Sequence, residues 1–147
     1  MKLALRLFFD ASVLIAAAGS KTGSSALILE LCHCHKAKAI CSRLILLEAD
    51  RNIRAKLSRD ALLRFYQEIG SLDLELVATP SQHEISKQRQ IINHKDAHVL
   101  AAAVKGNVDF LLTLDRKHFM SSKVLDAEFP FQIMTPGDFL HRWLLDT

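Results

Sequence analysis

The sequence predicts a single α/β domain over residues 1–147, with a mainly parallel central sheet of about five strands flanked by helices. Two apolar segments, Leu3–Phe9 and Val108–Leu114, are continuous enough to be strands buried on both faces, and each is followed directly by an aspartate. Between them, short apolar segments alternate with stretches of helical periodicity, an order typical of parallel strands joined by crossover helices. A chain of 147 residues has the length of one ordinary domain.

The remaining elements follow in order along the chain. Ser12 is expected to cap a helix that begins at Val13, and 19–25 is expected to be a loop. Apolar residues at helical spacing predict the helices 26–35, 44–57, 60–69, 84–92, 96–105 and a last helix from Pro136. Gly106 is expected to cap the fifth of these. Short apolar segments predict the strands 39–42, 72–79 and 131–134.

Composition and charge narrow the class of protein. Half of the residues are apolar and 24% are charged, with only five glycines and three prolines, which leaves no room for a long linker. The net charge of +3 is compatible with an anionic partner such as nucleic acid. Arg6 and Asp10 interrupt the apolar amino terminus, and no segment reaches the roughly 18 apolar residues of a membrane span. Three cysteines make no complete disulfide framework, so we expect a cytoplasmic protein without membrane association.

Four acidic residues are the candidate site. Asp10 and Asp115 each follow the carboxyl end of a buried strand, at the edge where ligands bind in parallel α/β sheets. Asp96 stands near the start of a helix, and Glu48 lies among apolar neighbours within one. Taken singly, Asp10 and Asp115 could cap the helices that follow them, and Asp96 could complement a helix dipole. Glu48 could lie on the exposed face of an amphipathic helix. Taken together, they would repel one another unless a divalent cation neutralised them.

The chemistry of such a site follows from its ligands. Carboxylate oxygens suit Mg²⁺ or Mn²⁺, which are shared with substrate phosphates in many enzymes. A cation of this kind activates water and stabilises the leaving oxygen in a displacement at phosphorus. Hydrolysis of a phosphodiester bond is therefore the predicted reaction. Because the ribose 2′-hydroxyl is not the nucleophile in this route, the products should carry 5′-phosphate and 3′-hydroxyl ends.

Four segments resemble the PIN-domain family and, within it, the compact VapC-like toxins. They are FFDASVLIAA, RLILLEADRNI, KDAHVLAAAVKG and VDFLLTLDRKHF, and the resemblance runs from residue 5 to about residue 140. It implies a Rossmann-like sheet, a Mg²⁺ or Mn²⁺ site and endoribonuclease activity on RNA. It also implies a homodimer and, for a toxin, a small antitoxin protein as partner.

The resemblance assigns roles residue by residue. Those matching the family's metal-binding acids are Asp10, Glu48, Asp96 and Asp115. Ser12 matches the small polar residue that supports the first acid, and Thr113 matches the polar residue before the last. The chain departs from the pattern at His98, where an apolar or acidic residue is frequent.

Basic residues flank the proposed ligands. Those beside Asp96 and Asp115 are Lys95, Arg116, Lys117 and His118, and those along the helix of Glu48 are Arg43, Arg51, Arg54 and Lys56. They either contact substrate phosphates or are ordinary solvated charges. Asp109 precedes the opposite end of a strand and is interpreted as structural.

Three other functions were weighed. A catalytically silent PIN-like module that binds RNA or protein would keep this fold, although such modules usually lose one or more of the acids. A phosphotransferase of the haloacid dehalogenase type needs a second aspartate where Ser12 stands. A zinc module would rest on 32–35 (CHCH) and Cys41, but residues two apart on a helix point to nearly opposite sides. We expect Cys32 and Cys34 to be ordinary residues at a helix end.

Overall fold

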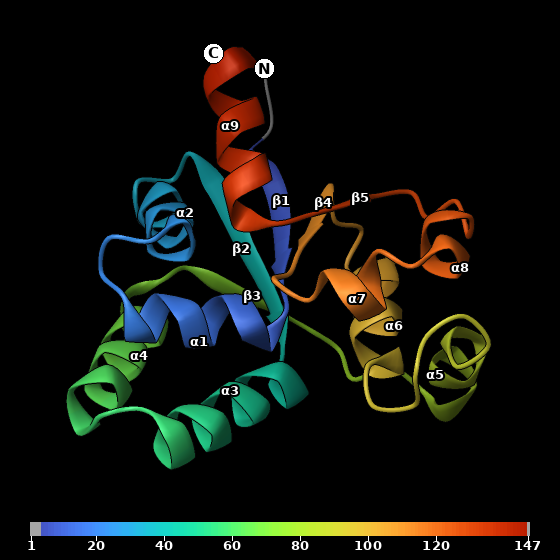
Figure 1. The fold of residues 1–147 in the computed structure, drawn as a ribbon, viewed down its shortest axis with the longest axis horizontal. Coiled ribbons are helices and arrows are strands. Elements are labelled where there is room, and N and C mark those ends of the chain that lie inside the picture. Colours follow the sequence, from blue (N-terminus) through green and yellow to red (C-terminus); the bar gives the residue numbers. More distant parts are fainter. Residues whose placement is uncertain (1–3, 147) are drawn as a thin grey trace.

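The computed structural model describes residues 4–146, and a parallel sheet lies at their centre (Figure 1). Its strands are β1 (Leu5–Phe9), β2 (Ala37–Ser42), β3 (Leu74–Val77), β4 (Phe110–Leu112) and β5 (Gln132–Met134). They lie in the order β3-β2-β1-β4-β5, and every neighbouring pair is parallel. The predicted α/β class with a parallel five-stranded sheet is confirmed.

Helices cover both faces of this sheet (Figure 1). They are α1 (Ala11–Gly19), α2 (Ser24–His33), α3 (Arg43–Lys56), α4 (Arg59–Ser71), α5 (Gln82–Gln88), α6 (Ala97–Lys105), α7 (Arg116–Phe119), α8 (Ser122–Leu125) and α9 (Pro136–Asp146). On one face, Phe110 of β4 packs edge-on against Phe139 of α9, with ring centroids 5.2 Å apart. On the other, Arg6 of β1 donates to the carbonyl of Gly106 at the end of α6 (2.7 Å).

The central strand explains why the core forms here. Leu7, Phe8 and Phe9 of β1 are completely buried, as expected for a strand covered on both faces.

The alanines of α6 let that helix approach the sheet closely, and Gly106 extends this close packing. A Cβ atom at Gly106 would lie only 2.9 Å from Cγ2 of Val77, so a larger residue would have to displace the Val77 side chain.

Several helix boundaries differ from the prediction, and side-chain caps set the starts of α1 and α5. The cap of α1 is Asp10 rather than Ser12, since Asp10 Oδ1 accepts a hydrogen bond from the Ala11 amide (2.9 Å). α5 begins earlier than predicted because Ser81 and Glu84 form a capping box, and it ends at Gln88 rather than at residue 92. α2 likewise begins earlier and ends before His35, whose φ of 57° is left-handed.

The strand boundaries also differ from the predicted ones. The predicted strand at 108–114 is reduced to Phe110–Leu112, although ladder-like hydrogen bonds continue on both sides. The Asp109 amide donates to the Arg6 carbonyl (2.9 Å), and the Thr113 amide donates to the Met134 carbonyl (3.0 Å). The predicted first strand began at Leu3, which lies outside the described residues. β3 is shorter than predicted, whereas β2 is longer.

Two short helices were not predicted, and one cap differs in detail. α7 and α8 have four residues each, too few for helical periodicity to show in the sequence, and they begin after Asp115 and Ser121. Gly106 caps α6 as predicted, but with a right-handed φ of −82°. The left-handed residue is the next one, Asn107, with a φ of 51°.

Within residues 4–146, no single helix is long and apolar enough to cross a bilayer. α1 and α2 meet the length and composition requirement only when taken together, and they are bent by 99° relative to each other.

Candidate active site

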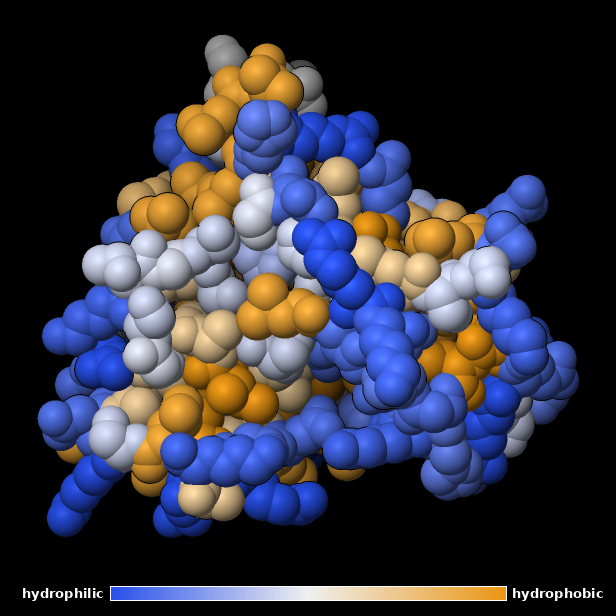
Figure 2. All heavy atoms as spheres, viewed as in Figure 1, coloured by the Kyte–Doolittle hydropathy of each residue, from blue (hydrophilic) through white to orange (hydrophobic). Residues whose placement is uncertain are grey.

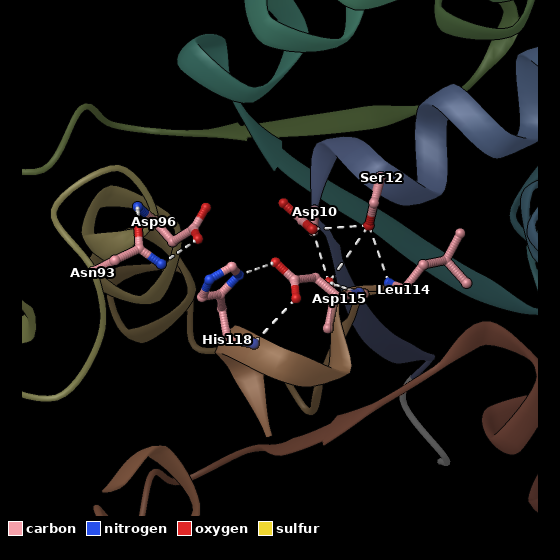
Figure 3. Close-up of polar contacts among 8 residues, drawn as sticks. Asp10, Ser12, Asn93, Asp96, Leu114, Asp115 and His118 are labelled. Atoms are coloured by element: carbon pink, nitrogen blue, oxygen red, sulfur yellow. Dashed lines mark hydrogen bonds and ion pairs between the residues drawn. The ribbon is translucent and has the colours of Figure 1, made fainter. Parts of the chain in front are cut away.

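All four predicted acids line one cavity of about 410 Å³ at the carboxyl edge of the sheet. Asp10 and Asp115 arrive there because β1 and β4 are neighbours in register, with Phe9 opposite Leu112. Asp96 comes from the start of α6 and Glu48 from α3. Figure 3 shows the carboxylates of Asp10, Asp96 and Asp115 directed toward a common space. The structure therefore brings together residues that are up to 105 positions apart in the sequence.

Asp10 is the most firmly held of the four. Only 6% of its surface is exposed, and three hydrogen bonds converge on its carboxylate. The Ala11 amide donates to Oδ1 (2.9 Å), while the Ser12 and Thr113 hydroxyls each donate to Oδ2 (2.8 Å). Asp10 thus caps α1, but a cap explains one of these contacts and leaves the other two to orient the carboxylate.

The hydroxyls of Ser12 and Thr113 also tie Asp10 to the segment that carries Asp115 (Figure 3). The Leu114 amide donates to Ser12 Oγ (3.0 Å), and the Asp115 amide donates to Thr113 Oγ1 (3.0 Å). Each hydroxyl therefore accepts from the backbone after β4 and donates to the carboxylate after β1. This arrangement fixes the two acids relative to each other.

Asp96 is oriented by Asn93, three residues earlier. Asn93 Nδ2 donates to Asp96 Oδ2 (2.7 Å), and the Asp96 amide donates back to Asn93 Oδ1 (3.0 Å). Although Asp96 occupies the N-cap position of α6, its side chain makes no capping hydrogen bond. The Asp96 carboxylate is therefore available to the cavity.

Asp115 pairs with His118 one turn later. The His118 amide donates to Asp115 Oδ1 (3.0 Å), and His118 Nδ1 lies 2.8 Å from Asp115 Oδ2. Asp96, Asp115 and His118 each offer one potential ligand atom, and these atoms all lie within 4.8 Å of one another. His118, expected only at the rim, is thus part of the centre itself.

Glu48 sits at the edge of the buried stripe of α3. Its neighbours Ile45 and Ala49 are completely buried, while Glu48 is half-buried and reaches the cavity. Ser42 is the N-cap of α3, and its hydroxyl accepts a hydrogen bond from the Ile45 amide (3.2 Å). One turn later, Asn52 donates to the Glu48 carbonyl (2.8 Å) and also lines the cavity.

Burial and mutual repulsion perturb the acids unequally. Burial raises the pKa of Asp10 despite the hydrogen bonds from Thr113 and Ser12, and the charge of Asp96 raises it further. Burial also raises the pKa of Glu48, and the charge of Asp10 adds to the effect. Burial acts on Asp115 in the same direction, but the hydrogen bonds from His118 outweigh it and lower the pKa of Asp115.

These residues fit a divalent cation of the magnesium class. Their donor atoms are mainly carboxylate oxygens, the ligands that Mg²⁺ and Mn²⁺ prefer. The charges of Asp10 and Asp96 disfavour each other in the absence of a counter-ion, which a bound cation would reverse. The three-residue group Asp96, Asp115 and His118 already places three donors close together.

The predicted rim residues divide into three groups. Lys95 and His118 line the acidic cavity, whereas Lys117 lines a neighbouring one. Arg116 lines neither and instead pairs with Asp138 (3.4 Å). Asp109 accepts from the Arg6 amide (2.8 Å) at the opposite edge of the sheet, as expected for a structural residue.

Sequence reasoning missed Asn93 and Asn52. The signal for Asn93 was an asparagine three residues before Asp96 at a helix start, a spacing that permits reciprocal side-chain and backbone hydrogen bonds. Asn52 carried a weaker signal, its position one turn after Glu48. Both are polar residues whose roles depend on where the cavity lies.

His98 and the Cys/His segment lie outside this acidic centre. Burial lowers the pKa of His98, and its Nδ1 is buried without a hydrogen-bond partner among the described residues. Cys32 is buried and Cys34 is exposed, as helical geometry predicted, so the two thiols do not face a common point. His33 between them lies 2.7 Å from the carboxylate of Glu68.

Replacing Thr113 tests the hydroxyl that connects Asp10 with the Asp115 amide. Thr113→Val keeps the shape of a fully buried side chain, but it removes the donor to Asp10 Oδ2 and leaves the part-buried Asp115 amide without its acceptor. We expect a loss of about 1–3 kcal/mol in the free energy of unfolding, measured by chemical denaturation. Thr113→Ser retains the hydroxyl and should recover most of this loss. Destabilisation by Thr113→Ser without destabilisation by Thr113→Val would show that the methyl group, not the hydroxyl, matters.

Comparisons with known proteins agree with this geometry. A family model described as PIN domain matches residues 6–117. VapBC2 from Rickettsia felis, solved bound to a DNA fragment from the VapBC2 promoter, has a TM-score of 0.60 at 16% identity, covering 88% of this chain and 97% of that chain. PAE2754 from Pyrobaculum aerophilum has a TM-score of 0.60 at 18% identity, covering 94% and 88%.

A third similar structure is VapC20 from Mycobacterium tuberculosis, described as a Sarcin-Ricin loop cleaving toxin. Its TM-score is 0.55 at 13% identity, with coverage of 84% of this chain and 95% of that chain. No curated protein sequence matches the chain significantly. At these identities the solved structures establish the fold, while the family model spans most of the sequence. The chain therefore belongs to the PIN-domain family.

Proposed function

We propose that the protein is a divalent-metal-dependent endoribonuclease that hydrolyses phosphodiester bonds in RNA. One observation carries the proposal, namely that Asp10, Glu48, Asp96 and Asp115 line the same cavity. Membership of the PIN-domain family supports it. The donor chemistry of the cavity favours Mg²⁺ or Mn²⁺ as the cofactor, held by these four acids.

The residues of the chain divide the work of hydrolysis. A divalent cation would supply charge neutralisation at the phosphate and a water of lowered pKa. Asp10 and Asp115, fixed to each other through Ser12 and Thr113, give the site its rigid half. Glu48, whose pKa is raised by burial and by Asp10, is a better proton acceptor than an ordinary glutamate and takes the proton of the attacking water.

The step balances without a further reactant. The water oxygen bonds to phosphorus as its proton passes to Glu48, and the bond between phosphorus and the 3′-oxygen breaks. The 3′-oxygen takes up a proton from solvent, and Glu48 later releases its own proton to solvent. Lys95 and His118 line the cavity, and on this proposal they would contact the non-bridging phosphate oxygens. The products therefore carry 5′-phosphate and 3′-hydroxyl ends.

We further propose that the chain is the toxin of a toxin–antitoxin pair. This rests on the shared fold with the two VapC-type structures, one of which is described as a toxin that cleaves the Sarcin-Ricin loop. On this proposal a small antitoxin protein binds the chain, the substrate is single-stranded or structured RNA, and the protein acts in the cytoplasm as a homodimer.

The ends of the RNA products test this mechanism. RNA cut by the purified protein in Mn²⁺ should be a substrate for ligation through its 5′-phosphate and for extension from its 3′-hydroxyl. A 2′,3′-cyclic phosphate would show that the ribose hydroxyl attacks phosphorus, and would contradict the proposed role of water. At saturating Mn²⁺, which compensates for the loss of one acidic ligand, Glu48→Gln should cleave more slowly than wild type in a single turnover, because this change keeps the size of the side chain and removes its basicity.

A further inference from the structure

A second cavity, of about 290 Å³, adjoins the acidic one. It is lined by residues that follow α5 and by residues of α7 and α8, elements that lie in the right half of Figure 1. Asn93 and His118 line both cavities, so the two share a wall. Asn93 orients Asp96 and His118 pairs with Asp115, which places the boundary between the cavities at the proposed catalytic centre.

The two cavities have opposite charge. No carboxylate lines the second cavity. Its charged lining residues include Arg89, Lys117 and Lys123. All three side chains are exposed, and none forms an ion pair within residues 4–146. Three cations from three different segments thus line one cavity without an ion pair of their own, although the charge of Lys117 also acts on Asp115.

The hydroxyl of Ser121 is a neutral hydrogen-bond donor that also lines this cavity. Ser121 accepts a hydrogen bond from the Val124 amide (3.4 Å), and no acceptor for its hydroxyl proton is found in the described part of the chain. Figure 2 shows the neighbouring surface over α7 as hydrophilic. A cavity with lysine, arginine and hydroxyl donors and no acid has the composition of a phosphate-binding site.

We propose that this basic cavity, lined by Arg89, Lys117, Ser121 and Lys123, binds a backbone phosphate of the nucleic acid next to the one that is cleaved. The inference rests on the proposed function, because it takes the acidic cavity as the site of the scissile phosphate. A single nucleotide places one phosphate at one cavity. A polynucleotide supplies phosphates to both at once, so the two cavities together select a chain of nucleotides.

Equilibrium binding of a short single-stranded RNA, measured by fluorescence anisotropy with Mg²⁺ in an Asp10→Asn background, tests the basic cavity without cleavage. The double change Arg89→Gln, Lys123→Gln should weaken binding by about tenfold at low salt, and the slope of log affinity against log salt should fall by about 0.7 for each lost phosphate contact. The control is Lys36→Gln, which removes an exposed positive charge between α2 and β2. It should change neither quantity appreciably. An equal loss in the control would show a general charge effect and overturn the proposal.

RNA with neutral linkages identifies the contacted group. Replacing the linkages that flank the cleaved bond by methylphosphonates should weaken binding to the parent protein but weaken binding to the double variant much less. If the methylphosphonates weaken binding by the same factor in the parent protein and in the double variant, Arg89 and Lys123 do not contact those phosphates. Inorganic phosphate should compete only weakly with RNA, since it reaches one cavity at a time. Competition by phosphate as strong as that by RNA would instead assign the cavity to a free anion.

The binding and cleavage results together distinguish failure of this inference from failure of the proposed function. Unchanged RNA affinity in the double variant, together with metal-dependent cleavage by wild type, would reject the basic cavity and keep the nuclease. Reduced affinity in the double variant without cleavage by any form of the protein would support the basic cavity and reject the nuclease.

Discussion

Asp10→Asn is expected to reduce metal-dependent RNA cleavage by a factor on the order of 10³ or more, because it removes a charged ligand from the rigid half of the centre. The carboxylate is buried and accepts three hydrogen bonds, so no other side chain can move in to replace it. Asparagine has nearly the same size and still offers an oxygen to the Ala11 amide. The measurement is the single-turnover rate of RNA cleavage in Mn²⁺.

The same variant should be at least as stable as wild type without metal. Burial and the charge of Asp96 raise the pKa of Asp10 in the folded protein above its unfolded value. For an acid shifted upward, the ionised form is disfavoured by folding, so stability is lost as the pH rises from the unfolded pKa through the folded one. Asp10→Asn removes this penalty, and its advantage should shrink on acidification through that interval. Denaturation in EDTA at neutral and mildly acidic pH measures both effects, and unfolding of the variant would identify Asp10 as a structural cap instead.

Mn²⁺ or Mg²⁺ is expected to stabilise the wild-type protein by about 2.7 kcal/mol when the cation is at a hundred times its dissociation constant. The reason is that the cation neutralises carboxylates that disfavour one another in the folded state. Asp115→Asn should lose most of this stabilisation, because Asp115 is one of the three residues whose ligand atoms lie within 4.8 Å of one another. Thermal unfolding with and without the cation provides the measurement.

The matched control for this experiment is Glu30→Gln. Glu30 is an exposed acid on α2, so the variant loses the same charge away from the cavity. It should respond to Mn²⁺ as wild type does. Equal stabilisation of Asp115→Asn and wild type would contradict a role for Asp115 in cation binding.

Much of the fold was readable in the sequence because its strands are buried on both faces. An apolar segment such as Leu7–Phe9 has few other stable placements than the centre of a parallel sheet, and the alternation with helices settled the class. The errors lie at element ends. Asp10 displaced Ser12 as the cap of α1, and α7 and α8 were too short to give a periodic signal.

In the candidate site too, some features could be predicted from the sequence and others could not. Asp10 and Asp115 were predictable as neighbours because both follow strands that end at one edge of the sheet. The role of Asn93 was not, since a loop asparagine acquires meaning only when its partner Asp96 and the cavity are in place. Likewise, Lys123 belongs to a helix that the sequence did not predict, and only the fold brings it to the same hollow as Arg89.

Cleavage of a mixed pool of single-stranded RNA is the most direct test of the central claim, that the four acids form a metal-dependent nuclease centre. Wild type, Asp115→Asn and Glu30→Gln would be compared in Mg²⁺, Mn²⁺ and EDTA. Wild type and Glu30→Gln should cleave with either cation and stop in EDTA, while Asp115→Asn should be inactive throughout. Cleavage by Asp115→Asn at the wild-type rate, or cleavage by wild type in EDTA, would contradict the claim.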